Sequence, residues 1–435
     1  MLSERWLRGR PEQARAALLR RHADAETLAA FETWLTLDGE RRAAATRYDT
    51  LAAEVKRLSA GGREASATVG GGAEREARQT AARQELRAAQ HTLDELTQRM
   101  RALALTLPNA PDARTPDGAD ASANRVVRAW GEPPTFDFAP QPHDALGAGL
   151  GILDLPRATR MSGPRMPLLV GAGAQLARAL AAFMLNAHAA AGYVEVSPPD
   201  LLLAATLTGT GHLPRHAEEL FALPADGLYL SPTAEAQLVA LRAGETLDAR
   251  DLPLAYTAYT QAYRREAGSA GARTHGLLRQ RQFGKVELVR VVPPDAADGA
   301  LAAMVAAAEG LLRGLDLPYR VVELCAGELP FSARRTFDLE VWLAGEGRYI
   351  EISSVSDCGD FQARRLGLRY RPRPGSAATF PHTLNGSALP IGRTLAALLE
   401  RGQRGDGSVA LPEALAPYGI PRLLLPLRGS TRTDR

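Results

Sequence analysis

The chain has 435 residues, of which 45% are hydrophobic and 23% are charged, and its formal net charge at pH 7 is +3. This composition excludes wholesale disorder, and the length suffices for two or three domains. Two cysteines exclude a disulfide scaffold, and no apolar run approaches the ~20 residues of a membrane-spanning helix. The N-terminus is rich in arginine, as transit peptides are, but it also carries Glu4 and Glu12. We therefore expect a cytoplasmic protein with reduced thiols.

Residues 26 to about 107 are rich in Ala, Arg, Glu, Gln and Leu. Apolar residues recur there at steps of three and four, in two stripes: Trp34, Leu37, Ala44, Tyr48, Leu51, Val55 and Leu58, then Ala82, Leu86, Ala89, Leu93, Leu96, Met100, Leu103 and Leu107. Glycines between residues 61 and 72 interrupt the pattern. The spacing predicts two long helices in an antiparallel coiled-coil hairpin. A helix bundle, a dimerisation coil and a solvated arm remain alternatives. Arginines outside the stripes could contact a phosphate backbone or keep the arm soluble.

Pro108 and Pro111 end the second helix, and a polar stretch follows. We place a linker at residues 111–144 and one large domain at 145–435. Within that domain the pattern predicts helices at 174–191, 298–315 and 391–401, and strands at 193–196, 228–230, 258–263, 283–292, 319–324, 337–343 and 349–353. Strands that follow one another with few intervening helices favour an α+β fold, with an antiparallel sheet flanked by helices.

The common nucleotide and zinc motifs are missing from the sequence: it has no P-loop, strand-linked G-x-G-x-x-G, H-E-x-x-H or C-x-x-C pattern. Almost every cation is arginine, and the lysines are Lys56 and Lys285. A lysine kept in so arginine-rich a chain indicates a position that arginine does not fill, which draws attention to Lys285.

One segment, residues 263–287, has the side chains of a nucleotide site. A predicted strand ends in Arg264 and Glu266, a loop of small residues follows, and the returning strand carries Phe283 and Glu287. Paired arginines bind phosphates bidentately, an aromatic ring stacks on a purine, and a carboxylate pairs with an ammonium group. A charged surface hairpin is the alternative for this segment by itself.

This segment closely resembles motif 2 of class II aminoacyl-tRNA synthetases, in particular the seryl-tRNA synthetases of the bacterial type. Other parts of the chain resemble the same family in order. Residues 192–199 resemble motif 1, residues 385–394 resemble motif 3, and Thr233-Ala234-Glu235 resembles the serine-binding loop. Three further segments also resemble sequences typical of the family: residues 337–342, 351–354 and 360–365. The resemblance covers essentially the full length. It implies a tRNA-binding domain over residues 1–110 and a class II catalytic domain over 145–435.

The resemblance further implies that the protein activates L-serine with ATP and transfers the seryl group to serine tRNA, with selenocysteine tRNA as a further acceptor to consider. Its catalytic residues would be Arg264, Arg393 and Glu351. ATP would contact these three, with Phe283 and Arg393 on the two faces of adenine, Glu266 at its amino group, and Arg279 and Ser354 nearby. Glu351 and Ser354 would hold Mg²⁺, and no zinc is expected. The serine pocket would comprise Thr233, Glu235, Arg264, Glu287, Asn385 and Ser387.

The same resemblance implies a homodimer in which the helical hairpin of one subunit binds the long variable arm of serine tRNA for the site of the other. Five features depart from the family pattern: Arg265, His275, Arg281, the segment Ser356-Asp357-Cys358-Gly359 and the glycine-rich tip of the hairpin. They leave a second interpretation, a divergent paralogue that makes seryl-adenylate or seryl-tRNA for a non-ribosomal pathway. A non-catalytic RNA-binding homologue is the third, although such proteins typically lose a motif 2 or motif 3 arginine.

Overall fold

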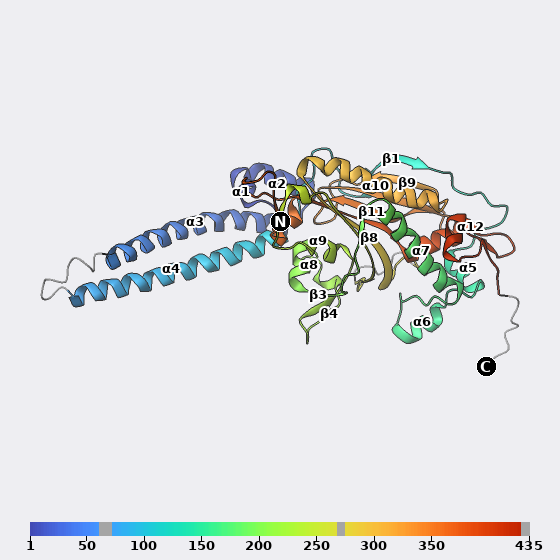
Figure 1. The fold of residues 1–435 in the computed structure, drawn as a ribbon, viewed down its shortest axis with the longest axis horizontal. Helices are drawn as coiled ribbons and strands as arrows, with labels where there is room; N and C mark the ends of the chain where they lie inside the picture. The colour runs from blue at the N-terminus through green and yellow to red at the C-terminus, as the bar shows by residue number, and fades with distance from the viewer. Residues whose placement is uncertain (61–71, 268–274, 428–435) are drawn as a thin grey trace. The chain divides into compact units, whose positions relative to one another are not determined.

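The computed structural model of the protein describes residues 1–60, 72–267 and 275–427 (Figure 1). The chain forms two compact units. One comprises residues 2–19 and 23–108, and the other comprises Met1, residues 20–22 and residues from 109 onward. The glycine-rich tip of the predicted hairpin and the small-residue loop of residues 263–287 lie mostly outside the described residues.

The first unit is dominated by two long helices, α3 (Ala25–Ala60) and α4 (Gly72–Thr106), after the short helices α1 (Glu4–Gly9) and α2 (Pro11–Arg20). α3 and α4 pack side by side along their length, as the two apolar stripes predict (Figure 1). Stripe residues form the buried seam between them: Trp34, Leu37, Leu51, Ala82, Ala89, Leu96, Met100 and Leu107. The predicted helical hairpin is therefore confirmed.

A buried carboxylate fixes the base of this hairpin. Asp38, on α3, is 2% exposed and accepts hydrogen bonds from Arg8 of α1 at 2.6 and 2.7 Å. Arg42, one turn further along α3, donates to the same carboxylate at 3.0 Å. The Arg8 guanidinium lowers the pKa of Asp38, so the carboxylate is charged and paired. This contact ties α1 to the base of α3.

The second unit is built on an eight-stranded sheet with the order β1-β9-β10-β11-β13-β8-β7-β2. The strands are β1 (Arg125–Trp130), β2 (Val194–Glu195), β7 (Leu254–Tyr263), β8 (Gln282–Val292), β9 (Tyr319–Glu323), β10 (Arg335–Leu343), β11 (Arg348–Asp357) and β13 (His382–Pro390). Neighbours pair antiparallel except β2 and β7, which are parallel. The α+β class with an antiparallel sheet is confirmed.

Three helices cover one face of this sheet: α7 (Ala172–Ala190), α10 (Ala297–Gly314) and α12 (Ile391–Gly402) (Figure 1). Their apolar residues form the main core with Val286 and Leu288 of β8. Successive side chains of a strand point to opposite faces. Lys285 and Glu287 therefore point away from the main core, to the face where Val289 packs against helix α9 (Glu235–Ala240). The functional residues discussed below lie on that second face.

Shorter elements complete the described part of this unit. The helices are α5 (His143–Gly149), α6 (Leu155–Ser162), α8 (Ala204–Thr210) and α11 (Phe361–Leu366), and the strands are β3 (Leu201–Leu203), β4 (Ala222–Leu223), β5 (Leu228–Leu230), β6 (Thr246–Asp248), β12 (Arg369–Arg371), β14 (Val409–Ala410) and β15 (Leu423–Leu424). Short 3₁₀ turns lie at 121–123, 217–219, 249–251, 294–296 and 413–418. Among the described residues, no helix is long and apolar enough to cross a membrane.

The three long helices of this unit begin and end within two residues of their predicted bounds. The structure adds strands that the pattern did not predict. β13 spans Asn385 and Ser387, whose polar sequence is not typical of a strand, and β1 lies in the segment assigned to a linker. β1 is on the sheet because its backbone pairs with β9, from Arg125 opposite Glu323 to Trp130 opposite Tyr319.

Candidate active site

Three neighbouring strands bring the predicted residues to one place. β7 and β8 pair with Ala262 opposite Phe283, so Arg264, just after β7, lies beside that ring. On the other side of β8, β13 pairs with Ser387 opposite Glu287. A pocket of about 300 Å³ opens beside them. It is lined by predicted residues, Arg264, Glu266, Arg279, Phe283, Glu351, Ser387 and Arg393, and also by Lys285 and Gln280.

Two arginines of the pocket are paired with carboxylates that also line it. Arg279 forms an ion pair with Glu266. Arg393, on the first turn of α12, lies 3.5 Å from the carboxylate of Glu351 and donates to the backbone carbonyls of Glu351 and Leu278 at 2.6 and 3.1 Å. These contacts hold the guanidinium groups of Arg279 and Arg393 at the pocket wall. An anionic ligand can replace the carboxylate and carbonyl groups as their partner.

Arg264 lies beside the aromatic wall of the pocket and is partly buried. Its guanidinium lies 5.3 Å from the centre of the Phe283 ring, and its Nε donates to the carbonyl of Pro232 at 3.3 Å. Burial lowers the pKa of Arg264 from its ordinary value, while Glu266 partly offsets this. A poorly hydrated guanidinium next to an aromatic ring is suited to bind an anion beside a stacked base.

A second group of polar residues extends from the pocket toward α9. The Thr233 hydroxyl donates to the Glu287 carboxylate at 3.2 Å. The Lys285 ammonium contacts both, at 3.1 Å from the threonine hydroxyl and 2.5 Å from the carboxylate. Thr233, Lys285 and Glu287 are all buried. The site prediction left out Lys285, and its signal in the sequence was the scarcity of lysine.

Glu235 lies at the far end of this group. Its carboxylate accepts hydrogen bonds from Gln362 at 2.7 Å and from Asn385 at 3.1 Å. Burial and the nearby Glu287 carboxylate raise the pKa of Glu235 to about 7. Asn385 also contacts the sulfur of Cys358. The sequence prediction missed Gln362, although it lies in the stretch 360–365 that resembles the family.

Glu351 and Ser354 are three residues apart on β11, and a regular strand would point them to opposite faces. The register between β10 and β11 shifts at a β-bulge. Leu339 pairs with Ser353, but Glu340 pairs with Glu351, so β11 has one extra residue, Ile352, between the two pairs. The shift reverses the alternation of side chains, so Ile352 and Val355 both enter the main core. The same shift lets Glu351 and Ser354 share the other face.

Asp338 lies directly opposite Ser354 in this sheet. Burial and the nearby Glu351 carboxylate raise its pKa well above the ordinary value. Within the described part of the chain, the Asp338 Oδ1 atom is buried without a hydrogen-bond partner. Two carboxylates and a hydroxyl, with one oxygen unsatisfied, are ligands that suit Mg²⁺. The residues present therefore fit the predicted ion, and Asp338 joins the predicted pair.

His275, one of the departures from the family pattern, is held by two carboxylates. Its ring nitrogens lie 3.0 Å from Asp144 and 2.6 Å from Glu346. Its ring stacks on that of His143 at 5.5 Å, and the buried His143 contacts Glu400 of α12 at 2.9 Å. The backbone N–H of Leu277 donates to the other nitrogen of His143 at 3.0 Å. This cluster fixes the chain just before Arg279.

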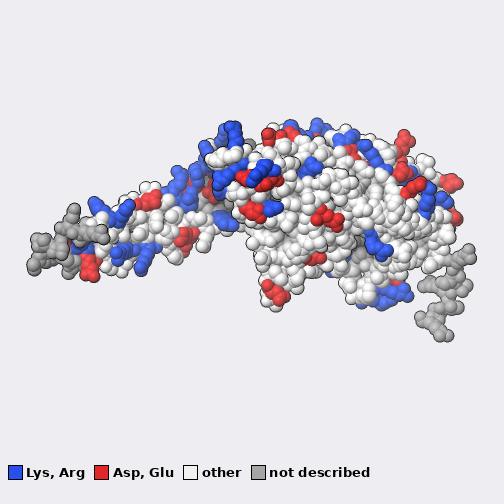
Figure 2. All heavy atoms as spheres, viewed as in Figure 1, with Lys and Arg blue, Asp and Glu red and all other residues white. Residues whose placement is uncertain are grey.

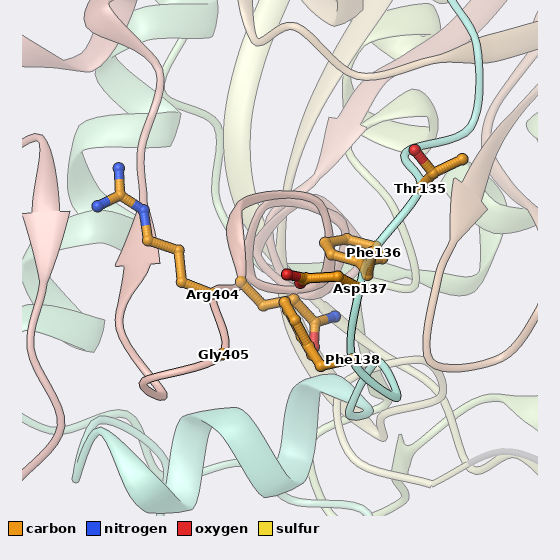
Figure 3. Close-up of a pocket in the computed structure, with 7 residues that line it drawn as sticks. Thr135, Phe136, Asp137, Phe138, Arg404 and Gly405 are labelled. Atoms are coloured by element: carbon orange, nitrogen blue, oxygen red, sulfur yellow. The ribbon is translucent and has the colours of Figure 1, made fainter.

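Another hollow, of about 670 Å³, lies between residues 135–138 and 403–405 (Figure 3). It is lined by Phe136, Phe138 and Asp137, and Arg404 points away from the two rings (Figure 3). None of the predicted site residues lines it. The charged groups needed for nucleotide chemistry gather instead in the pocket around Arg264.

Comparisons with known proteins identify the family of the chain. The family model of the seryl-tRNA synthetase N-terminal domain matches residues 1–111, and that of the class II tRNA synthetase core domain (G, H, P, S and T) matches residues 222–402. A serine--tRNA ligase of Synechococcus sp. (strain JA-2-3B'a(2-13)) is 45% identical over 432 residues, 98% of each chain. The chain belongs to the seryl-tRNA synthetase family.

Other members of the family extend the comparison. A serine--tRNA ligase of Nitratidesulfovibrio vulgaris is 44% identical and is covered over its whole length by 97% of this chain. The crystal structure of seryl-tRNA synthetase from Pyrococcus horikoshii complexed with ATP superposes with a TM-score of 0.92, at 30% identity, over 98% of this chain and 100% of that one. A cytoplasmic serine-tRNA ligase from Naegleria fowleri in complex with AMP gives a TM-score of 0.84 at 25% identity, over 96% of each chain. The family relationship therefore covers both units.

Proposed function

We propose that the protein is a serine--tRNA ligase that converts L-serine and ATP to seryl-adenylate and pyrophosphate and then transfers the seryl group to tRNA. The observation that carries the proposal is that a pocket suited to a nucleotide adjoins a group of residues suited to an amino acid. The pocket of Arg264, Arg279 and Arg393, with Phe283 at its wall, suits a nucleotide triphosphate. It continues through Lys285 into the carboxylate and hydroxyl of Glu287 and Thr233, which suit a small amino acid.

In the first step, a carboxylate oxygen of serine forms a bond to the α-phosphorus of ATP. The bond from that phosphorus to the bridging oxygen breaks, and pyrophosphate leaves with the electron pair. Negative charge grows on the α-phosphate, where fixed cations lower the barrier most. We assign this role to Arg264, with Arg393 and Arg279 on the outer phosphates. Phe283 would stack on adenine and Glu266 would accept from its amino group.

Glu351, Ser354 and Asp338 would hold Mg²⁺. When bound, the ion would neutralise phosphate charge. Their position beside Arg393 supports the assignment, because Arg393 contacts Glu351 directly.

For serine, we propose that Glu287 and Thr233 bind the ammonium group and that Asn385 and Ser387 lie at the hydroxyl. Glu235 would orient Asn385 through their hydrogen bond. A site that pairs its buried polar groups with a hydroxyl rejects alanine strongly, since those groups would otherwise stay unpaired. Threonine must be rejected by the size of the pocket.

In the second step, a ribose hydroxyl at the 3′ end of tRNA attacks the seryl carbonyl carbon and loses its proton, and AMP leaves. We propose that residues 1–110 bind the tRNA, with the hairpin of α3 and α4 on the long variable arm of serine tRNA. Figure 2 shows basic and acidic side chains interspersed along the hairpin, and we assign the phosphate contacts to the basic ones. RNA helices are bound largely through their backbone and shape.

We also propose a homodimer. Apolar side chains around motif 1 are exposed in the single chain, with Val194 59%, Leu201 49% and Leu203 61% exposed. An exposed apolar cluster marks a protein contact surface. Light scattering coupled to gel filtration tests this, and a mass near 46.5 kDa would contradict it. The cytoplasmic location stays a prediction.

The decisive experiment is serine-dependent ATP–pyrophosphate exchange, run beside charging of total tRNA, with threonine, alanine and glycine as competing amino acids. Exchange and charging with serine support the proposal. Exchange without charging would favour the paralogue, and no exchange with any amino acid would contradict both.

A further inference from the structure

The amino-acid end of the site already contains an ammonium group. Lys285 Nζ lies 2.5 Å from Glu287 Oε2 and 3.1 Å from Thr233 Oγ1. These are the two groups to which the proposed function assigns the ammonium of serine. The lysine and substrate ammonium groups are the same chemical group, with only N–H donors. Both cannot occupy one carboxylate oxygen without strong like-charge repulsion.

Lys285 also has another place to go. Its side chain lines the pocket of Arg264, Arg279 and Arg393, where the phosphates are proposed to lie. A lysine stem has four rotatable carbons and ends in a compact charge, so it can turn between two anions while its backbone stays in β8. An arginine in this position would bind Glu287 through a rigid fork and release it less readily. That difference explains why position 285 is a lysine. Of the 52 Lys and Arg residues in the chain, only Lys56 and Lys285 are lysines.

We propose that Lys285 is a catalytic residue that exchanges partners: it occupies the ammonium position in the free enzyme, and moves to the α-phosphate when the amino acid and ATP bind. The exchange conserves charge pairing. Serine brings an ammonium that replaces lysine on Glu287, and ATP brings the anion that lysine then neutralises. This inference rests on the proposed function and adds a residue to its chemistry.

The exchange of partners couples the two binding events, so that a bound nucleotide raises the affinity for the amino acid and a bound amino acid raises the affinity for the nucleotide. While Lys285 stays on Glu287, only the minor fraction of molecules with a free carboxylate can bind a substrate ammonium, which weakens apparent affinity in proportion. A nucleotide that draws Lys285 to its phosphates removes this competition. A lysine that stayed on Glu287 as a structural partner would give no such coupling.

The test separates the ammonium from the carboxylate of the substrate. Ethanolamine carries the ammonium and hydroxyl of serine but has no carboxylate. Because it makes no ion pair with Lys285, its affinity reports only the competition between the two ammonium groups. Its affinity is measured by calorimetry for the wild-type chain, alone and with a non-hydrolysable ATP analogue. We expect the analogue to raise the affinity by about tenfold, the factor for a competitor bound nine-tenths of the time. Equal affinities would overturn the proposal without any variant.

Lys285→Met gives the second readout. We expect it to bind ethanolamine about tenfold more tightly without nucleotide, to lose the effect of the analogue, and yet to lower kcat for serine-dependent exchange by about 100-fold or more. Lys285→Arg should bind ethanolamine less tightly than Lys285→Met and should not restore kcat. Unchanged kcat, or weaker ethanolamine binding by folded Lys285→Met, would overturn the proposal.

Lys56→Met makes the same chemical change at an exposed position of α3, in the unit proposed to bind tRNA, and should alter neither ethanolamine affinity nor serine-dependent exchange, which both proceed without tRNA. Thermal unfolding of each variant separates loss of folding from loss of function. If the wild-type chain shows no exchange with serine, the proposed function fails. If it exchanges normally and the nucleotide does not change ethanolamine affinity, only the role of Lys285 fails.

Discussion

Asn385 donates a hydrogen bond to the carboxylate of Glu235 at 3.1 Å, although 150 residues separate them in the chain. Gln362 donates to the same oxygen at 2.7 Å. Two amide donors favour the charged carboxylate, but burial and Glu287 outweigh them and raise the pKa of Glu235 to about 7. The protonation state of Glu235 therefore changes within the physiological pH range.

Glu235→Gln should alter the pH dependence of stability. The folded-state pKa lies above the ordinary value, so the contribution of Glu235 to stability is fully present below about pH 4.5 and is lost as pH rises through about 7. The variant should gain stability relative to wild type between pH 5 and pH 8, by on the order of 2 kcal/mol. Urea unfolding at both pH values measures this. Glu413→Gln, at an exposed ion pair, is the control, and an equal difference at both pH values would contradict the prediction.

Arg264→Ala and Arg393→Ala should each lower serine-dependent pyrophosphate exchange by about 100-fold or more, since each removes a fixed charge from a developing anion. Arg264→Lys should recover little, because a lysine cannot reproduce the bidentate fork. Arg422→Ala, which removes an exposed partner of Glu413, is the matched control and should leave exchange unchanged. Exchange at more than a tenth of the wild-type rate in Arg264→Ala would argue against the assigned role.

His275→Gln should lose stability mainly at low pH. Burial lowers the pKa of His275, but the Asp144 and Glu346 carboxylates raise it by more, so the net shift is upward. Arg348, paired with Glu346 at 3.4 Å, and the stacked His143 also face this cluster. The stabilisation is fully present below about pH 6.5 and is lost as pH rises through the higher folded-state pKa. Melting temperatures of wild type and variant should differ at pH 6 and converge at pH 9.

The effect is modest, because the His275 side chain is 43% exposed. His275→Arg keeps the charge at every pH and should remove the pH dependence. If the variants differed equally at pH 6 and pH 9, the histidine would act through packing alone.

Arg83→Gln with Arg87→Gln, on the exposed surface of α4, should reduce tRNA charging and leave pyrophosphate exchange unchanged. Each lost phosphate contact should reduce the slope of log affinity against log salt by about 0.7 to 0.9. Filter binding of serine tRNA over a salt series measures the slope. Glu85→Gln, on the same helix, is the control and should bind at least as tightly. Unchanged affinity in the double variant would place the tRNA elsewhere.

The helical hairpin and the long helices were predictable because each depends on a local period. Trp34, Leu37 and Leu51 recur at helical spacing, and that spacing alone places them on one buried face. Most strands of the eight-stranded sheet were predictable for a similar reason, since their apolar runs are bounded by turns. β13 was not, because Asn385 and Ser387 form a strand only through pairing with β8 and β11.

The candidate site divides in the same way. Arg264 and Glu351 followed from a family resemblance, whereas Asp338, Gln362 and the contacts of Lys285 depend on which strands become neighbours. The bulge beside Ile352 has no signal in the single strand, because it is a property of two paired strands. Sequence reasoning identified most of the charged residues of the site, without Asp338 and Lys285, and left open which of them pair.

The place of β1 in the sheet has a consequence for synthesis on the ribosome. Arg125 pairs with Glu323, which is translated 198 residues later. At about 5–20 residues per second, this edge of the sheet waits roughly 10 to 40 s for its partner strand. During that interval Val126 and Val127 are part of an unpaired strand in the nascent chain. Pairing of β1 is thus a late event of biosynthesis: a chain that stops before residue 319 lacks β9, β10, β11 and β13, and β1 then has no neighbouring strand with which to pair.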